Sequence, residues 1–134
     1  MAQNPQDVDR RPKGELAIRT LAMPADANPN GDIFGGWLLS QMDIAGGIVA
    51  FQRARGRVVT VAIDAMTFHT PVLVGDVVCC YADVRKIGRT SLTLGIEAWA
   101  ITRADGTRRL VTEGTFTYVA IDDAKRPRPV PHDR

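Results

Sequence analysis

The sequence predicts an α+β domain in which an antiparallel sheet packs against one long helix. One helical segment, near residues 34–55, follows a short strand segment and precedes four longer ones. Successive strands joined by short turns favour antiparallel pairing. The chain has 134 residues, 45% of them hydrophobic and 24% charged, which suits one domain with one hydrophobic core.

The elements before the helix are short. Residues 1–14 are polar and contain two prolines and Gly14, so we expect a flexible N-terminal tail. Residues 15–23 should form a short strand. The stretch 24–32 is dense in proline, asparagine, aspartate and glycine, and it should therefore form a loop.

The helix is expected to begin near Phe34, with Asp32 as its N-cap residue. It should end at Ala54 or Arg55, because Gly56 is typical of the position after a helix. Its many glycines and alanines would let it lie close against a curved sheet.

After the helix the hydrophobic period changes to two, as in β-strands. The expected strands cover residues 57–69, 77–86, 90–103 and 108–121. The last turn contains Asp105-Gly106, a strong hairpin signal. We expect these four strands to form an antiparallel meander. Because one helix leaves a sheet face and an edge strand poorly covered, the domain should dimerise.

Charge and length argue against several classes of protein. The net charge is only +2, and basic residues gather near both ends: Arg10, Arg11, Lys13, Lys125, Arg126 and Arg128. Such clusters are typical of solvated tails, here 1–14 and 123–134, and they also suit phosphate-bearing ligands. No aromatic residues interleave with them, so we expect no nucleic-acid binding. No apolar run reaches transmembrane length and no signal peptide is visible, so we expect a cytoplasmic protein that does not enter a membrane.

The two cysteines, Cys79 and Cys80, are neighbours in a strand segment, so their side chains should leave opposite faces. A disulfide between them is geometrically poor, and no second pair is present to build a metal site. We therefore expect two small buried side chains in a reducing compartment, and no metal.

Asp43 is the first candidate for chemistry. It interrupts an apolar and small-residue run, and helical spacing places it on one stripe with Gly36, Leu39, Ser40, Gly46, Gly47 and Ala50. A carboxylate on a packing face is costly unless it is paired, hydrogen-bonded or needed for chemistry. Alternatively, Asp43 points outward where the helix crosses the sheet, or caps a local backbone group.

Several blocks of sequence carry a resemblance to a known family. They are Arg19-Thr20-Leu21-Ala22-Met23-Pro24, Asn30-Gly31-Asp32-Ile33-Phe34-Gly35-Gly36-Trp37-Leu38, Ser40-Gln41-Met42-Asp43, Gly56-Arg57-Val58-Val59-Thr60-Val61, Met66-Thr67-Phe68 and Val74-Gly75-Asp76-Val77-Val78-Cys79-Cys80-Tyr81. They resemble the bacterial acyl-CoA thioesterases of the YciA type, in the hot-dog fold superfamily. The resemblance covers about residues 17–122, and the block 31–37 is highly specific.

The resemblance implies a hot-dog domain over 15–122, with an antiparallel sheet wrapped around the central helix. It implies dimers that commonly assemble into a trimer of dimers, a hexamer. It also implies hydrolysis of acyl-CoA to free acid and CoA, with coenzyme A as part of the substrate and no separate cofactor. The family's catalytic carboxylate falls on Asp43, which would act as a general base or as a nucleophile.

The resemblance also assigns roles around the start of the helix. Backbone N–H groups of Gly35 and Gly36 would polarise the thioester carbonyl, although both glycines also suit simple helix–sheet clearance. Asn28, in the preceding loop, would face the carboxylate of a partner subunit and orient water or the thioester. Asn28 equally suits a turn.

For the coenzyme A moiety, the resemblance points to the turn Gly88-Arg89-Thr90-Ser91, where Arg89 would contact nucleotide phosphates. Taken alone, this turn is only a hairpin. Val59 and Thr60 would line the tunnel for the pantetheine arm, and the basic C-terminal tail could add a phosphate contact.

Two other residues and two other functions are compatible with the sequence. His69 suits a structural strand end or a catalytic acid or base, and Asp64 suits a structural or supporting role. An acyl dehydratase or hydratase on the same fold would need a histidine paired with an acid, for which His69 is the candidate. A non-catalytic acyl-CoA sensor would carry an added DNA-binding module, for which fourteen N-terminal residues are too few.

Overall fold

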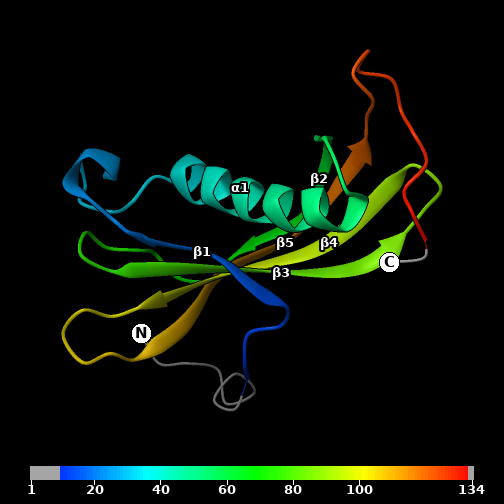
Figure 1. Cartoon of the computed structure of the whole chain (residues 1–134). Coiled ribbons are helices and arrows are strands. Elements are labelled where there is room, and N and C mark those ends of the chain that lie inside the picture. The colour runs from blue at the N-terminus through cyan, green and yellow to red at the C-terminus, as the bar shows by residue number, and fades with distance from the viewer. Residues whose placement is uncertain (1–9, 133–134) are drawn as a thin grey trace.

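The computed structural model describes residues 10–132, in which one long helix lies against one face of a five-stranded sheet (Figure 1). The elements are β1 (Glu15–Leu21), α1 (Gly35–Ala54), β2 (Val58–Phe68), β3 (Val77–Ile87), β4 (Ser91–Ile101) and β5 (Arg108–Ala120), with a 3-10 turn at Pro24–Asp26. The predicted α+β class and order of elements are confirmed, and the strand ends agree with the expected ones to within two residues.

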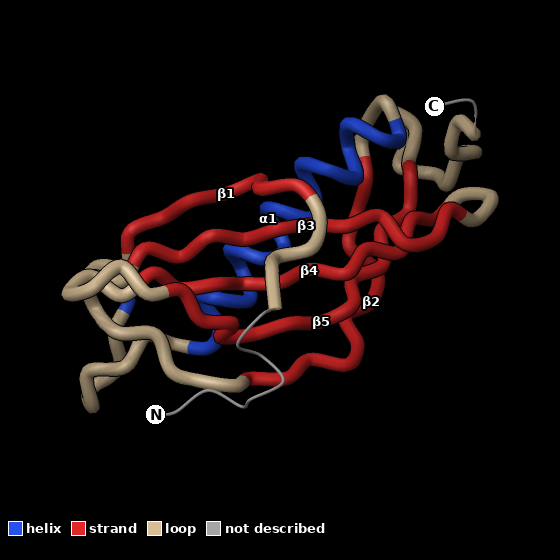
Figure 2. The backbone as a smooth tube through the Cα atoms, turned by 90° about the horizontal axis from the view of Figure 1, so that it is seen from below, coloured by secondary structure: helices blue, strands red, loops and turns tan. Residues whose placement is uncertain are grey.

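The strand order in the sheet is β1-β3-β4-β5-β2, and every neighbouring pair is antiparallel. The expected meander is correct for β3, β4 and β5 but wrong for β2, which pairs with β5. The reason is the path of α1, which crosses the face of the sheet obliquely (Figure 2). It takes the chain from the β1 edge to the opposite edge, where β2 forms, and residues 69–76 lead back to β3.

The buried face of α1 differs from the expected stripe. The helix buries Leu38, Met42, Ala45, Gly46, Val49, Ala50 and Ala54. Of the expected stripe, Gly36 and Ser40 are exposed and Asp43 is half-buried. The buried face combines Leu38, Met42 and Val49 with four small residues, while Ile44, Ile48 and Phe51 are exposed. Asp43 therefore lies at the margin of the buried face.

Gly46 is the position where the helix most needs a glycine. A methyl group added there would overlap the Tyr118 hydroxyl and Cδ1 of Ile96. The close approach that we expected from the small residues therefore occurs at Gly46, against β4 and β5.

The bounds of α1 agree with expectation, but its N-cap residue does not. The N-cap residue is Phe34, which makes no side-chain capping hydrogen bond, so the prediction of Asp32 as the cap is wrong. Asp32 instead forms an isolated β-bridge with Leu73. At the other end Arg55 takes the left-handed conformation, with φ of 57°, and Gly56 follows it.

The described parts of both expected tails are held against the domain. On the sheet face opposite α1, Nη2 of Arg10 lies 2.9 Å from Glu97 Oε2 and 2.8 Å from Glu113 Oε1. At the C-terminal end, Arg128 Nη2 donates to the Ala54 carbonyl at 2.9 Å, and Val130 is 2% exposed. Arg10, Arg128 and Val130 therefore anchor these segments to the domain, while residues 122–127 are exposed. Residues 1–9 and 133–134 of the expected tails lie outside the described residues.

Strand β2 has one uncovered edge and exposes apolar side chains. Val59, Val61, Ile63 and Phe68 are all exposed, Val61 and Phe68 each to 55%. In addition, no helix within residues 10–132 has the length and apolar character needed to span a membrane.

Gly46→Ala and Gly47→Ala form a matched pair that tests the close contact. Alanine normally stabilises a helix interior over glycine by about 0.8–1 kcal/mol. A methyl group at Gly47 meets nothing within 4 Å, so Gly47→Ala should raise the free energy of unfolding by about that amount. Gly46→Ala should lower it by about 1–3 kcal/mol, because the methyl group overpacks the contact. Urea unfolding measures both, and equal effects of the two changes would contradict the contact.

Candidate active site

Asp43 lies near the middle of α1, where two hydroxyl groups hold its carboxylate. Thr60 Oγ1 donates to Asp43 Oδ1 at 2.6 Å. The Tyr118 hydroxyl donates to the same Oδ1 and to the Asp43 backbone carbonyl, each at 3.0 Å. No lysine, arginine or histidine within residues 10–132 forms an ion pair with Asp43. The half-buried carboxylate is thus oriented by neutral donors and is not paired with a cation of the described chain.

The two hydroxyl donors come from opposite positions of neighbouring strands. Thr60 of β2 and Tyr118 of β5 are direct partners in the antiparallel ladder. Residues that face each other in this way project from the same side of a sheet, here the side that α1 covers. The sequence resemblance indicates Thr60 only as a tunnel residue, and no motif in the sequence indicates Tyr118. The signal in the sequence is weak. Tyr118 lies two residues after Phe116 and shares its core-facing side of the strand. Which residue of β2 lies opposite Tyr118 depends on the register of the two strands.

The Tyr118 hydroxyl is a donor and stays protonated. Burial, followed by the negative charge of Asp43 and the hydrogen bond to it, raises the pKa of the Tyr118 phenol well above its ordinary value. Tyr118 is therefore not an acid or base at neutral pH. The cysteines are also unsuited to catalysis, since both are buried and burial raises the pKa of the Cys80 thiol to about 12.

The start of α1 leaves backbone N–H groups free. The N–H groups of Trp37 and Leu38 donate to the Phe34 carbonyl, whereas those of Gly35 and Gly36 have no acceptor within residues 10–132. A methyl group at Gly36 would meet nothing within 4 Å, and one at Gly35 would touch the Phe68 ring at 3.5 Å. Clearance from the sheet therefore does not explain Gly36. The two free donors are open to a ligand.

Asn28 fills the turn role that its residue type allows. Its Oδ1 accepts hydrogen bonds from the N–H groups of Asn30 and Asp32, at 2.9 and 3.1 Å. Its Nδ2 donates to no group within residues 10–132. Asn28 makes no hydrogen bond to Asp43 of the same chain, so a single chain does not bring these two candidates together.

The turn between β3 and β4 presents an uncommitted cation. The Gly88 N–H donates to the Ser91 carbonyl at 2.8 Å, which closes the expected hairpin. Arg89 is exposed, and its guanidinium makes no hydrogen bond or ion pair within the described part of the chain. Its backbone carbonyl accepts from the Val130 N–H at 2.8 Å, which places the C-terminal segment beside this turn. Val59 is exposed on β2, next to Thr60.

His69 belongs to a hydrogen-bond network around Glu113 of β5 rather than to the surroundings of Asp43. Its Nε2 lies 2.8 Å from Glu113 Oε2, and Arg10 holds both oxygens of the same carboxylate. The hydrogen bonds from Arg10 are the main cause of a pKa for Glu113 below its ordinary value, opposed by partial burial and helped by His69. A histidine–acid pair is therefore present, but its acid is fully engaged by Arg10.

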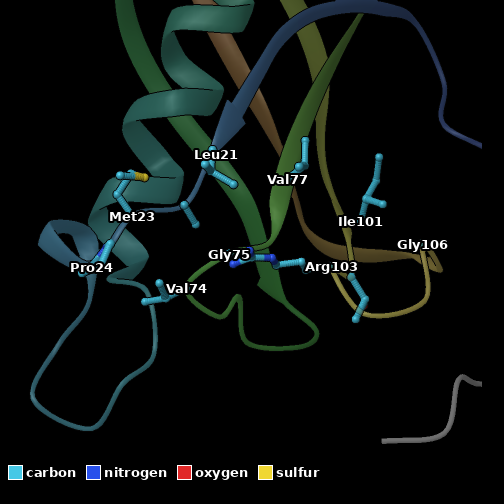
Figure 3. A pocket seen from close by; sticks show the side chains of 11 residues that line it. Leu21, Met23, Pro24, Val74, Gly75, Val77, Ile101, Arg103 and Gly106 are labelled. Carbon is cyan, nitrogen blue, oxygen red and sulfur yellow. The ribbon is translucent and has the colours of Figure 1, made fainter.

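The other candidate residues within 10–132 do not form a second site of this kind. Asp64 is exposed on β2, and its carboxylate has no hydrogen-bond partner within residues 10–132. No group of three or more metal-binding side chains occurs in that range either. An apolar pocket of about 690 Å³ lies at the ends of β1, β3 and β4 (Figure 3). Leu21, Met23, Val77 and Ile101 line it, and none of the candidate residues named above does.

Comparison with known proteins places this geometry in a family. A model of the thioesterase superfamily matches residues 30–107. The chain belongs to the thioesterase superfamily. It is 58% identical over 127 residues to the acyl-CoA thioester hydrolase YciA of Salmonella typhimurium, across 92% of this chain and 96% of that protein.

Two solved structures of similar proteins share its fold. The hexameric thioesterase y2039 from Yersinia pestis is 61% identical, with a TM-score of 0.87 over 90% of this chain and 98% of the other. Cj0915, a hexameric hotdog fold thioesterase of Campylobacter jejuni, is 37% identical, with a TM-score of 0.84 over 90% of this chain and 92% of the other. The hot-dog fold that the sequence resemblance implied is thereby confirmed.

Proposed function

We propose that this protein hydrolyses acyl-CoA to a free carboxylic acid and CoA, with Asp43 as the catalytic carboxylate. The observation that carries the proposal is a half-buried carboxylate held by two neutral hydroxyls and paired with no cation within residues 10–132. Membership of the thioesterase superfamily and the similarity to an acyl-CoA thioester hydrolase support the same reaction.

In the proposed reaction, free N–H groups at the start of α1 polarise the thioester. The N–H groups of Gly35 and Gly36 donate to the carbonyl oxygen, on which negative charge develops. As a base, Asp43 takes a proton from water, whose oxygen bonds to the carbonyl carbon. The carbon–sulfur bond then breaks and the CoA thiolate takes up the proton. As a nucleophile, Asp43 itself bonds to that carbon, CoA leaves, and water hydrolyses the mixed anhydride.

The proposed binding of CoA uses the turn between β3 and β4. Arg89 offers an uncommitted guanidinium for phosphate, and Gly88, Thr90 and Ser91 let the ligand approach the backbone. Val59 and Thr60 flank the path of the pantetheine arm. No metal or separate cofactor takes part. A cytoplasmic location is supported by the two free, buried cysteines.

We also propose that the site is shared between subunits of a dimer. Gly35 and Asp43 are eight positions apart on one helix, about 12 Å along its axis at 1.5 Å per residue. A carbonyl oxygen within hydrogen-bond reach of Gly35 therefore lies too far from Asp43 of the same chain, so the partner must supply the carboxylate. The exposed edge and apolar side chains of β2 offer the surface for pairing. Three such dimers would form the hexamer, the assembly of the similar Yersinia pestis thioesterase.

The function is tested by release of free thiol from acyl-CoA. Asp43→Ala should lower turnover by about 100- to 10,000-fold, because the reaction loses its base or nucleophile. Asp83→Ala, which removes a carboxylate of β3 outside the Asp43 network, is the matched control and should keep wild-type turnover. Circular dichroism and gel filtration check that both variants fold and assemble. Normal turnover in Asp43→Ala would refute the proposal.

The same assay separates the two rival functions. Stoichiometric binding of acyl-CoA without thiol release would identify a sensor. Formation of enoyl-CoA that stops in His69→Ala would identify a dehydratase or hydratase.

The shared site is tested by mixing two inactive variants. Asp43→Ala and Asn28→Ala subunits, unfolded and refolded together, should regain up to about a quarter of wild-type activity. This follows from random pairing of two chains, in which one of the two sites of each mixed dimer is intact. Each variant refolded alone is the control. No recovery in verified mixed dimers, with both parents inactive, would contradict a site built from two chains.

A further inference from the structure

We infer that Tyr118 and Thr60 are positioning residues that leave Oδ2 of Asp43 as the reacting oxygen. The inference rests on the proposed function, which assigns the reaction to Asp43 but not to either oxygen. It deepens that function by naming the groups that orient the carboxylate and the atom that they leave free.

The hydrogen bonds divide the two carboxylate oxygens. Oδ1 accepts from Thr60 Oγ1 at 2.6 Å and from the Tyr118 hydroxyl at 3.0 Å. Oδ2 accepts from no group within residues 10–132. Hydrogen bonds to a charged oxygen stabilise its lone pairs and make them less available for a proton or a carbon. Proton transfer from water, or attack on the thioester carbon, is therefore expected at Oδ2.

Tyr118 fixes the side chain and the backbone of Asp43 together. Its single hydroxyl proton is shared between Oδ1 and the backbone carbonyl of Asp43, each 3.0 Å away. Such a three-centre contact ties the rotamer of the carboxylate to the position of the helix on the sheet. Thr60 closes the other side of Oδ1 from the opposite strand position.

Gly46 makes this arrangement possible. It lies one helical turn after Asp43, and a methyl group there would overlap the Tyr118 hydroxyl. Burial also keeps the Tyr118 hydroxyl protonated, since it raises the pKa of the phenol, so Tyr118 remains a donor throughout the reaction. Gly46 and Tyr118 therefore support the orientation of Asp43 and take no part in proton transfer.

Oδ2 of Asp43 is the reacting oxygen on both possible routes. On the base route, Oδ2 gains the water proton as the water oxygen bonds to the carbonyl carbon, and returns it to the thiolate as the carbon–sulfur bond breaks. On the nucleophile route, Oδ2 bonds to the carbonyl carbon and the thiolate leaves with a solvent proton. Water then cleaves the anhydride and restores the carboxylate. Oδ1 keeps its two hydrogen bonds in both cases.

A double-mutant cycle on steady-state hydrolysis of acyl-CoA tests the inference. Tyr118→Phe should lower kcat by roughly 10- to 100-fold, the range for losing a hydrogen bond to a charged group, and leave KM within about 2-fold. In an Asp43→Ala background the same change should have no further effect, because nothing is left to position. Tyr81→Phe is the matched control, since Tyr81 is the other tyrosine of the chain and is not part of this network.

A second pair of variants covers the case in which Tyr118→Phe folds poorly. Thr60→Val keeps the shape of the side chain but loses the hydroxyl and should lower kcat, whereas Thr60→Ser should recover most of that loss. An unchanged kcat in Tyr118→Phe and Thr60→Val, with Asp43→Ala inactive, would overturn this inference alone. Equal losses in the wild-type and Asp43→Ala backgrounds would also overturn it, since they indicate a purely structural role. Full activity of Asp43→Ala would overturn the proposed function as well.

Discussion

The close contact between α1 and β5 at Gly46 is the constraint on which the site depends. Because Gly46 has no side chain, the Tyr118 hydroxyl can reach past it to the backbone and side chain of Asp43. The depth at which the helix lies on the sheet and the orientation of the carboxylate are thus set by the same contact. A larger residue at this point would change both at once.

The two faces of the sheet have different roles. The helix face carries Asp43 and its hydroxyl donors. The opposite face is closed by Arg10, which bridges Glu97 and Glu113 across β4 and β5, where Glu97 is 1% exposed. Arg10 pairs with both carboxylates and His69 contacts one of them, so the charged groups of that face bind one another. The site chemistry therefore belongs to the helix face and to the exposed start of α1.

Local sequence patterns predicted most of the helix and strand segments, but they did not predict which distant strands pair with each other. The change of hydrophobic period at Gly56 placed the strands correctly, and a carboxylate in an apolar helix singled out Asp43. The position of β2 beside β5 was missed, because strand order depends on where the helix delivers the chain. Tyr118 was missed for a related reason: its contact with Asp43 follows from the pairing of Thr60 with Tyr118, which no local pattern encodes. The terminal segments were assigned to solvent by their charge, yet Arg10 and Arg128 bind groups far away in sequence.

The most direct test of the central claim is the turnover of acyl-CoA by an Asp43→Asn variant. Asparagine keeps the size of the side chain and an oxygen that can accept from Thr60 and Tyr118, but it removes the charge and the basic, nucleophilic oxygen. If the charge of Asp43 performs the chemistry, kcat should fall by at least about 100-fold in a variant whose folding and assembly match the wild type. Turnover within about 10-fold of the wild type would contradict the account, since the position of the side chain alone would then suffice.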